Sequence, residues 1–231
     1  MKTGIFIISA VLTAACALIA VYFMRACHEK SYKRAAGLKT LAGLCFVLIG
    51  LMMAATVSTD KHFAWPVAAG LVLGLLGDAL LAVRFIKPEQ HDLYFVTGAL
   101  SFAFGHGLYI FALLTKYDIS LAVALSFGIV ALAAVACYIM GKKADAGRLM
   151  IFGGVYITLV VGMGAVAIGA ATAVPCASTL LFAVGGLMFP ISDSVLSAYS
   201  FGPDNRFSLN ITIHATYYLA QLCIAWSLGW A

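Results

Sequence analysis

The sequence predicts an all-α, polytopic membrane protein with eight transmembrane helices. The prediction rests on the composition, on the apolar runs and on the distribution of the basic residues. Of the 231 residues, 64% are hydrophobic and 10% are charged, and the mean hydropathy is +1.05. A water-soluble domain carries about 25% charged residues, because water must solvate its surface. The composition therefore excludes a soluble enzyme, a disordered chain and a protein that binds nucleic acid.

Eight apolar runs are each long enough to cross a bilayer, which takes about 20 residues. In chain order they cover residues 3–24, 38–58, 64–83, 93–115, 119–140, 149–171, 177–199 and 208–230. The polar breaks between the runs are too short to be linkers, so we expect a single transmembrane domain over residues 1–231. The first run reaches Met24, which is too long for the apolar part of a signal peptide, so we expect an uncleaved helix there.

The basic residues predict the orientation of these helices. Eleven of the 14 fall in the breaks after the first, third, fifth and seventh runs, and only Lys2, Lys61 and Lys116 lie on the other side. The eleven are Arg25, Lys30, Lys33, Arg34, Lys39, Arg84, Lys87, Lys142, Lys143, Arg148 and Arg206. Because cytoplasmic loops carry the excess of Lys and Arg, both termini are expected outside the cytoplasm. The short loops and the chain length favour a bacterial inner membrane.

Two acidic residues lie inside the apolar runs, Asp78 in 64–83 and Asp193 in 177–199. A carboxylate at this depth costs several kcal/mol unless it is protonated, paired or hydrated, so each is a candidate functional residue. Asp78 precedes Arg84 by six residues, which places it about 9 Å inside the cytoplasmic end at the rise of an α-helix. Asp193 lies at a similar distance before Gly202. We therefore expect the two carboxyls at one level, in the cytoplasmic half of the bilayer.

Polar side chains also form stripes at helical spacing, and each must find a partner in a dry interior. The stripe in 93–115 consists of Gly98, Ser101, Phe102, Gly105, His106 and Tyr109. The stripe in 208–230 consists of Asn210, His214, Tyr217 and Gln221. The stripe in 177–199 consists of Gly186, Phe189, Asp193 and Ser197, with Ser192 beside the aspartate and Pro190 one turn before it. Glycines in such stripes allow a neighbouring helix to approach closely.

Segments 77–82 and 192–197 resemble one another, and each precedes a helix that carries a histidine. This similarity suggests two parallel four-helix halves around a central cavity, with the two aspartates facing one another across it. A metal site built from His106, His214 and the aspartates is disfavoured, because His106 is expected at a different depth from the carboxyls. The six cysteines show no CxxC spacing, so we expect neither a disulfide framework nor a zinc site.

Four segments resemble the lysoplasmalogenase-like membrane proteins, the YhhN family. They are 76–81 (LGDALL), 102–109 (FAFGHGLY), 186–193 (GLMFPISD) and 217–221 (YYLAQ), in the right order on the right helices. The resemblance covers most of the chain from the third run onward. It implies a hydrolase that cleaves the vinyl ether bond of lysoplasmalogens, with Asp78 and Asp193 catalytic and no metal or other cofactor. Pro190 departs from the family pattern and puts the local geometry of its helix in question.

The residues suit this chemistry independently of the family resemblance. A vinyl ether is cleaved by protonating its β-carbon, after which water attacks the oxocarbenium ion, and two carboxyls suit the acid and base roles. Eight polar side chains would then line the substrate site: Ser101, His106, Tyr109, Ser192, Asn210, His214, Tyr217 and Gln221. The substrate would be a lysophospholipid drawn from the bilayer. Arg84, Lys87 and Arg206 could attract its phosphate, although plain topology signals explain them better.

The same features permit another function. Eight helices with paired carboxyls also suit a proton-coupled transporter or lipid carrier, in which the aspartates would relay protons. Two observations favour the enzyme: the carboxyls lie off-centre toward one face, and the four segments match the family. The sequence does not specify the head-group preference, the roles of the two aspartates or the oligomeric state.

Overall fold

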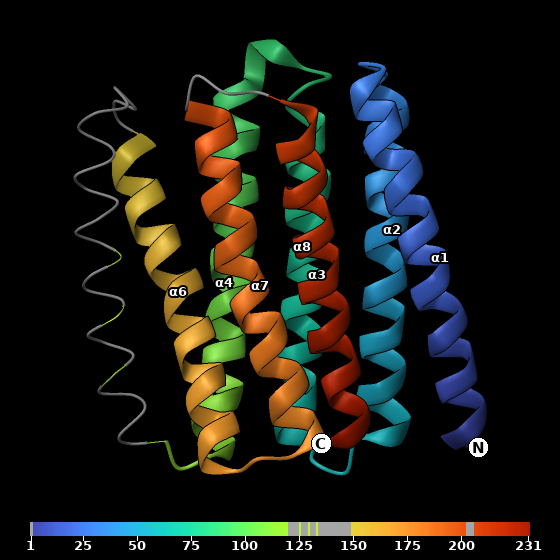
Figure 1. The fold of residues 1–231 in the computed structure, drawn as a ribbon, viewed down its shortest axis with the longest axis vertical. Coiled ribbons are helices and arrows are strands. Elements are labelled where there is room, and N and C mark those ends of the chain that lie inside the picture. The colour runs from blue at the N-terminus through green and yellow to red at the C-terminus, as the bar shows by residue number, and fades with distance from the viewer. Residues whose placement is uncertain (1, 120–124, 126–128, 130–132, 134–148, 202–205) are drawn as a thin grey trace.

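The computed structural model describes residues 2–119, 125, 129, 133, 149–201 and 206–231, and this part of the chain is helical without strands. Its helices are α1 (Lys2–His28), α2 (Tyr32–Met52), α3 (Lys61–Val83), α4 (His91–Lys116), α6 (Leu149–Ala173), α7 (Ala177–Phe201) and α8 (Phe207–Ser227) (Figure 1). Three shorter segments complete it: a π-helical turn at Met53–Val57 and 3-10 turns at Pro88–Gln90 and Leu228–Trp230.

Seven of the expected helices are confirmed, and the eighth, over 119–140, falls almost entirely outside the described residues. Within the described part, six helical segments are long and apolar enough to cross a membrane, and α8, with its polar stripe, is not among them. The chain is therefore an integral membrane protein. The count of eight helices and their division into two parallel halves around a cavity remain predictions.

The boundary between the first two helices differs from the expected one. α2 begins at Tyr32, six residues before the expected start, because α1 ends in a compact cap. Lys30 adopts a left-handed backbone conformation (φ 54°), and the Ser31 N–H donates to the Ala26 carbonyl. This pattern is a Schellman cap, which reverses the chain within a few residues. As a consequence, Lys39 lies two turns inside α2 rather than at its start.

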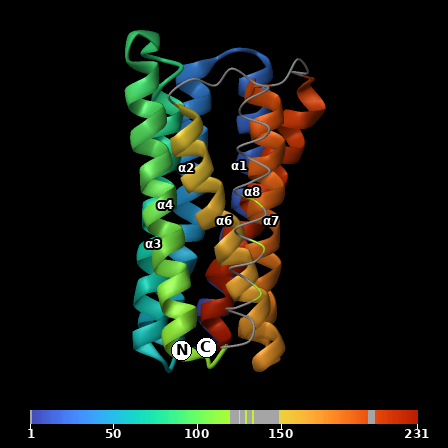
Figure 2. The same ribbon diagram turned by 90° about the vertical axis from the view of Figure 1, so that its left-hand side faces the viewer.

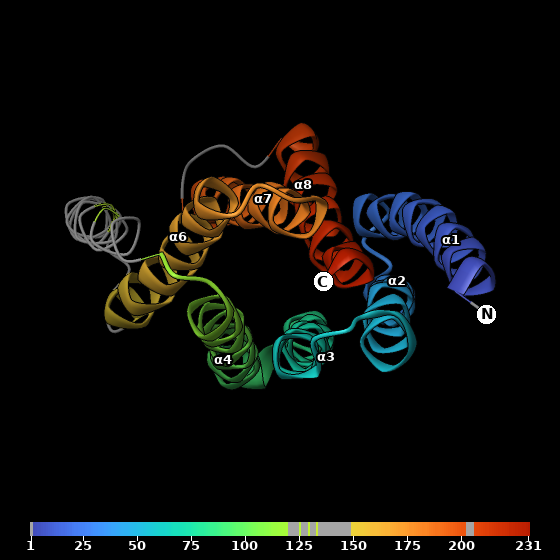
Figure 3. The ribbon, with the colours of Figure 1, turned by 90° about the horizontal axis from the view of Figure 1, so that it is seen from below.

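The helices form two facing rows when viewed along their length (Figure 3). α6, α7 and α8 make one row and α4, α3 and α2 the other, with α1 packed against α2 and α8. Contacts of α4 with α6 and of α2 with α8 join the rows at their two ends. Figure 2 shows both termini at the same end of the helices. In the middle of the bundle α8 packs against both α7 and α3, and these three helices carry most of the candidate site.

Large apolar side chains point outward along the helices, as they do in a protein surrounded by lipid. Val11 on α1, Phe104 on α4 and Leu180 on α7 are all more than half exposed. A soluble monomer rarely leaves so much contiguous apolar surface uncovered. The inward faces instead carry the polar stripes.

Glycines bring α3 and α4 close together at the level of the site. A Cβ atom at Gly105 would lie 3.1 Å from the Gly70 carbonyl oxygen, and one at Gly98 would lie 3.3 Å from the Gly77 carbonyl oxygen. The expected role of the glycines in the α4 stripe is thereby confirmed for these two. Their close approach holds the α4 stripe against α3, the helix that carries Asp78.

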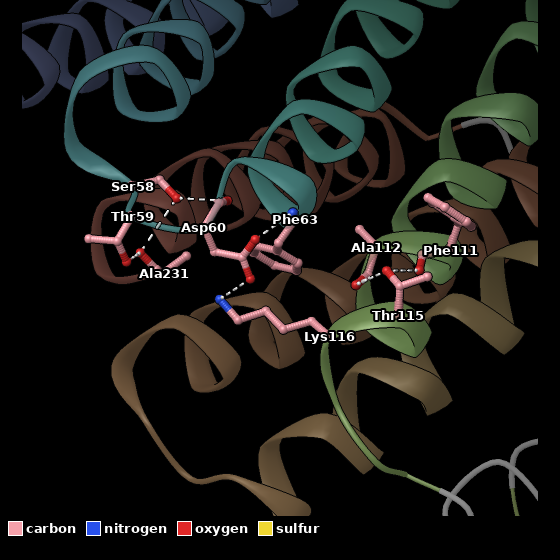
Figure 4. A network of polar contacts seen from close by, with 9 residues as sticks. All are labelled: Ser58, Thr59, Asp60, Phe63, Phe111, Ala112, Thr115, Lys116 and Ala231. Carbon is pink, nitrogen blue, oxygen red and sulfur yellow. Dashed lines mark hydrogen bonds and ion pairs between the residues drawn. The ribbon is translucent and has the colours of Figure 1, made fainter.

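A polar network stabilises the start of α3, at the end of this helix away from Asp78 (Figure 4). Asp60 caps this helix, because its side chain accepts a hydrogen bond from the Phe63 N–H and pairs with Lys116 of α4 at 3.4 Å. Next to it, the Thr59 N–H donates to the Ala231 carbonyl at 3.0 Å. The network ties the start of α3 to α4 and to the segment that follows α8.

Candidate functional site

Asp78 lies in the last two turns of α3 and is almost fully buried, with 1% of its side chain exposed. Its Oδ1 accepts an ion-paired hydrogen bond from the Lys39 ammonium at 3.0 Å. Its Oδ2 accepts a hydrogen bond from the Tyr217 hydroxyl at 2.7 Å. Both oxygens therefore have a partner, and a cation balances the carboxylate charge.

A chain of hydrogen bonds extends from Asp78 across the bundle. The Tyr217 hydroxyl accepts from the Gln221 amide at 3.0 Å, and the Gln221 carbonyl oxygen accepts from the Tyr109 hydroxyl at 3.3 Å. These residues belong to α8, α8 and α4, so the chain joins three helices including α3. The expected face of α4 is confirmed, since all six members of its stripe are buried. Three of the expected lining residues thus meet around the first carboxyl.

Asp193 lies on α7 in different surroundings. Its side chain is buried, and its Oδ2 accepts a hydrogen bond from the Tyr156 hydroxyl of α6 at 2.7 Å. Its neighbour Ser192 turns toward α8 and donates to the Ile213 carbonyl at 3.0 Å. Within the described ranges, no cation lies within ion-pair distance of Asp193.

Aromatic rings connect the surroundings of the two carboxyls. The ring of Phe189, one turn before Asp193, lies 5.7 Å from the Tyr217 ring and 4.7 Å from the His106 ring. The His106 ring also lies 6.1 Å from the ring of Tyr156. Phe189 precedes Asp193 by four residues, which is about 6 Å along an α-helix. Histidine and aromatic rings therefore pack between the surroundings of the two carboxyls.

His106 is 1% exposed, and neither ring nitrogen has a hydrogen-bond partner among the described residues. A buried polar atom without a partner is costly, so such atoms in native proteins usually meet a water or a ligand. The His106 ring therefore marks a position suited to a small polar group near Tyr156 and Tyr109.

The other expected lining residues are spread more widely. The Ser101 hydroxyl donates to the Leu73 carbonyl of α3 at 2.7 Å, which is a structural bond between helices. His214 packs edge-on against Phe23 of α1 at 4.6 Å. Asn210 lies near the start of α8, and its buried Oδ1 has no partner within the described part of the chain. Ser197 belongs to the residues whose side chains are not described. Among the described residues, Ser101, His214 and Asn210 therefore make no hydrogen bond to either carboxyl.

Two residues that contact the carboxyls were not among the sequence candidates. Lys39 was counted among the topology signals, because it lies at the very start of the expected run 38–58. It falls on the buried face of α2, four residues after Ala35 and three before Ala42, and this spacing is the signal that could have identified it. Tyr156 is the second, and it shares helical spacing with the buried Val160 on α6. A tyrosine hydroxyl on such an apolar face needs a polar partner on a neighbouring helix.

At the rim, Arg84 follows the last residue of α3, and its guanidinium lies 4.6 Å from the Phe85 ring and 5.3 Å from the Phe95 ring. Burial lowers the pKa of Arg84 to about 10, so the side chain still carries its charge at neutral pH. No group of three or more His, Cys, Asp or Glu side chains is arranged to hold a metal ion in the described residues. The five described cysteines are free.

The arrangement offers two buried carboxyls with unlike partners, an ammonium for Asp78 and a phenol for Asp193. Comparisons with curated proteins and with solved structures found no match. A comparison with protein-family models matched the YhhN family over residues 35–228, which takes in both carboxyls, Lys39, most of α2 and all of α3, α4, α6, α7 and α8. The chain belongs to the YhhN family.

Proposed function

We propose that the protein is an intramembrane hydrolase that cleaves the vinyl ether bond of lysoplasmalogens. The products are a fatty aldehyde and glycerophosphoethanolamine or glycerophosphocholine. The observation that carries the proposal is the presence of two buried carboxyls with unlike partners, Asp78 and Asp193, within one bundle. Membership of the YhhN family supports it, because that family resembles the lysoplasmalogenases.

The reaction needs a proton donor and a proton acceptor in a dry site. One aspartic acid delivers its proton to the β-carbon of the vinyl ether, and the π electrons form the new C–H bond. The second aspartate accepts a proton from water as the water oxygen bonds to the oxocarbenium carbon. The resulting hemiacetal breaks at the ether C–O bond and releases the aldehyde. Inverting glycosidases divide these tasks between two carboxyls in the same way.

The surrounding side chains suit a single-chain lipid that enters from the bilayer. His106 can hold the attacking water or a glycerol hydroxyl, since both of its ring nitrogens lack a partner among the described residues. Tyr109, Tyr217 and Gln221 hold one carboxyl in a fixed position. In the proposed orientation this end of the bundle faces the cytoplasm of a bacterial cell, so the lipid enters from the inner leaflet.

The proposal is tested by incubating purified protein in lipid nanodiscs with alkenyl and acyl lysophospholipids of equal chain length. We expect free fatty aldehyde from the alkenyl lipid alone, because the acyl lipid has no vinyl ether to protonate. Release of fatty acid from the acyl lipid without aldehyde from the alkenyl lipid would contradict the proposal.

A second candidate is a proton-coupled transporter or lipid carrier. The buried Asp78 carboxyl and its hydrogen bond from the Tyr217 hydroxyl favour it, because buried carboxyls serve as proton relays in transporters. Substrate-dependent proton uptake into liposomes, measured with an internal pH dye in the absence of aldehyde release, would select this candidate over the hydrolase.

A further inference from the structure

We propose that Lys39 determines which aspartate is the acid and which is the base, by holding Asp78 as a carboxylate and leaving Asp193 as the proton donor. The inference deepens the proposed function, which leaves these two roles open. Lys39 acts here as a positioning residue, since it touches Asp78 and not the reacting carbon.

The geometry of the ion pair directs the Lys39 ammonium to Asp78. α2 and α3 run in opposite directions, so Lys39, seven residues after the start of α2, lies level with Asp78 near the end of α3. The Lys39 ammonium lies 3.0 Å from Asp78 Oδ1, and its side chain is only 12% exposed. The rings of Phe23 and Tyr217 lie 5.9 and 6.0 Å from the same nitrogen. The ammonium is therefore shielded from water. Among the described residues it forms an ion pair with Asp78, whereas it acts on Asp193 only from beyond ion-pair distance.

The groups that face the two carboxyls differ in charge. Asp78 meets an ammonium from α2 and a hydroxyl from α8. Asp193 meets the Tyr156 hydroxyl from α6, and no cation within the described residues pairs with it. A nearby opposite charge favours the charged form of a buried carboxyl, whereas burial with a neutral partner favours the protonated form. The two aspartates thus differ in protonation although their own chemistry is the same.

This division closes the reaction cycle without an outside proton donor. Asp193 gives its proton to the β-carbon and becomes a carboxylate, and Asp78 takes a proton from the attacking water. When the hemiacetal breaks, Asp78 returns that proton to the departing ether oxygen. Asp193 accepts the proton of the hemiacetal hydroxyl as the carbonyl forms. Both groups then have their starting protonation, and one water has been consumed.

The test is the infrared absorption of protonated carboxyls in the full-length protein in nanodiscs near neutral pH. We expect a protonated-carboxyl band that disappears in Asp193→Asn and persists in Asp78→Asn. Lys39→Met should add a second such band, which the double variant Lys39→Met/Asp78→Asn should lack. Lys39→Arg keeps the cation and should keep the original spectrum. The inference is overturned if Asp78→Asn removes the original band, or if Lys39→Met adds none.

Lys116→Met is the matched control, because it breaks the Asp60 ion pair at the other end of α3 with the same change of side chain. It should add no buried protonated-carboxyl band, and a band equal to that of Lys39→Met would contradict a specific role for Lys39. In turnover, Lys39→Met should lower kcat by about 10²-fold or more with little change in KM, since it removes the base from its working form. The infrared result does not depend on activity, so a correct spectrum without aldehyde would reject the hydrolase and keep the assignment of charges.

Discussion

The two ends of α3 each carry an aspartate paired with a lysine, yet the two pairs differ in what surrounds them. Asp60 caps the start of the helix, its side chain is 34% exposed, and Lys116 reaches it from α4. Asp78 lies near the other end, is 1% exposed, and meets Lys39 from α2. An exposed pair adds little to stability, whereas a buried pair carries a large desolvation cost that geometry must offset. The comparison indicates that the first pair fastens a helix end and that the second keeps a charge where the proposed reaction needs one.

The largest expected effect separates the two pairs by function. Asp78→Asn and Asp193→Asn should each lower the rate of aldehyde release by about 10³-fold or more, because each removes an acid or a base. Asp60→Asn, the same change at the other end of α3, should leave the rate within a factor of about two, because its pair contributes only to stability. Initial rates with the alkenyl lysophospholipid measure both. An active Asp78→Asn variant would remove that residue from the mechanism.

Two adjacent tyrosines on α8 test the importance of the hydrogen bond to Asp78 in the buried pair. Tyr217→Phe removes the donor to Asp78 Oδ2 and should destabilise the protein by about 1.5–3 kcal/mol, the usual value for a hydrogen bond to a charged group. Tyr218→Phe is its control, because the Tyr218 hydroxyl is buried without a partner among the described residues. Thermal unfolding in a mild detergent compares the two. Equal losses would show that the bond to Asp78 carries no special weight.

Helix packing around Asp78 provides a third contrast. A Cβ atom at Gly77 would lie 2.6 Å from the Phe102 ring and 3.1 Å from the Gly98 carbonyl, so Gly77→Ala should push α4 away at the level of the site. We expect a loss of about 1–3 kcal/mol, as for other overpacked cores. Gly107→Ala on α4 meets no atom within 4 Å and should be neutral or stabilising by up to about 1 kcal/mol. Unfolding midpoints of the two variants test this, and a tolerated Gly77→Ala would contradict the close approach.

The smallest expected effect is the pH dependence of the partly exposed pair of Asp60 and Lys116. Burial alone would raise the pKa of Asp60, but the Phe63 N–H and the Lys116 ammonium outweigh it and lower that pKa below its ordinary value of 3.8. The ionised form therefore stabilises the folded state above the ordinary value, and this contribution disappears as the pH falls through the lowered pKa. Asp60→Asn should cost about 0.2–1 kcal/mol near neutral pH and less in acid. Unfolding midpoints of both proteins across the acidic range measure it, and a constant difference would contradict the ionic origin.

The sequence predicted those features that depend on local pattern. The long apolar runs predicted seven helices with ends no more than six residues from the observed ones, and helical spacing predicted the buried face of α4. The start of α2 was wrong, because the Schellman cap at Lys30 depends on a backbone conformation that glycine, not lysine, usually signals. The contacts between helices could not be predicted from the sequence in the same way. Lys39 and Tyr156 reach their aspartates from other helices, and a pattern within one helix does not specify its neighbours.

In the proposed reaction Asp78 and Asp193 catalyse the hydrolysis of a vinyl ether, and the bond between the alkenyl carbon and the ether oxygen breaks. The most direct measurement is mass spectrometry of both products made from an alkenyl lysophospholipid in water labelled with heavy oxygen. The account predicts that aldehyde forms together with a glycerophospho-alcohol that carries no label, because its ether oxygen is retained. It also predicts that neither product forms with Asp78→Asn or Asp193→Asn. An absence of aldehyde, or heavy oxygen in the glycerol product, would contradict the account.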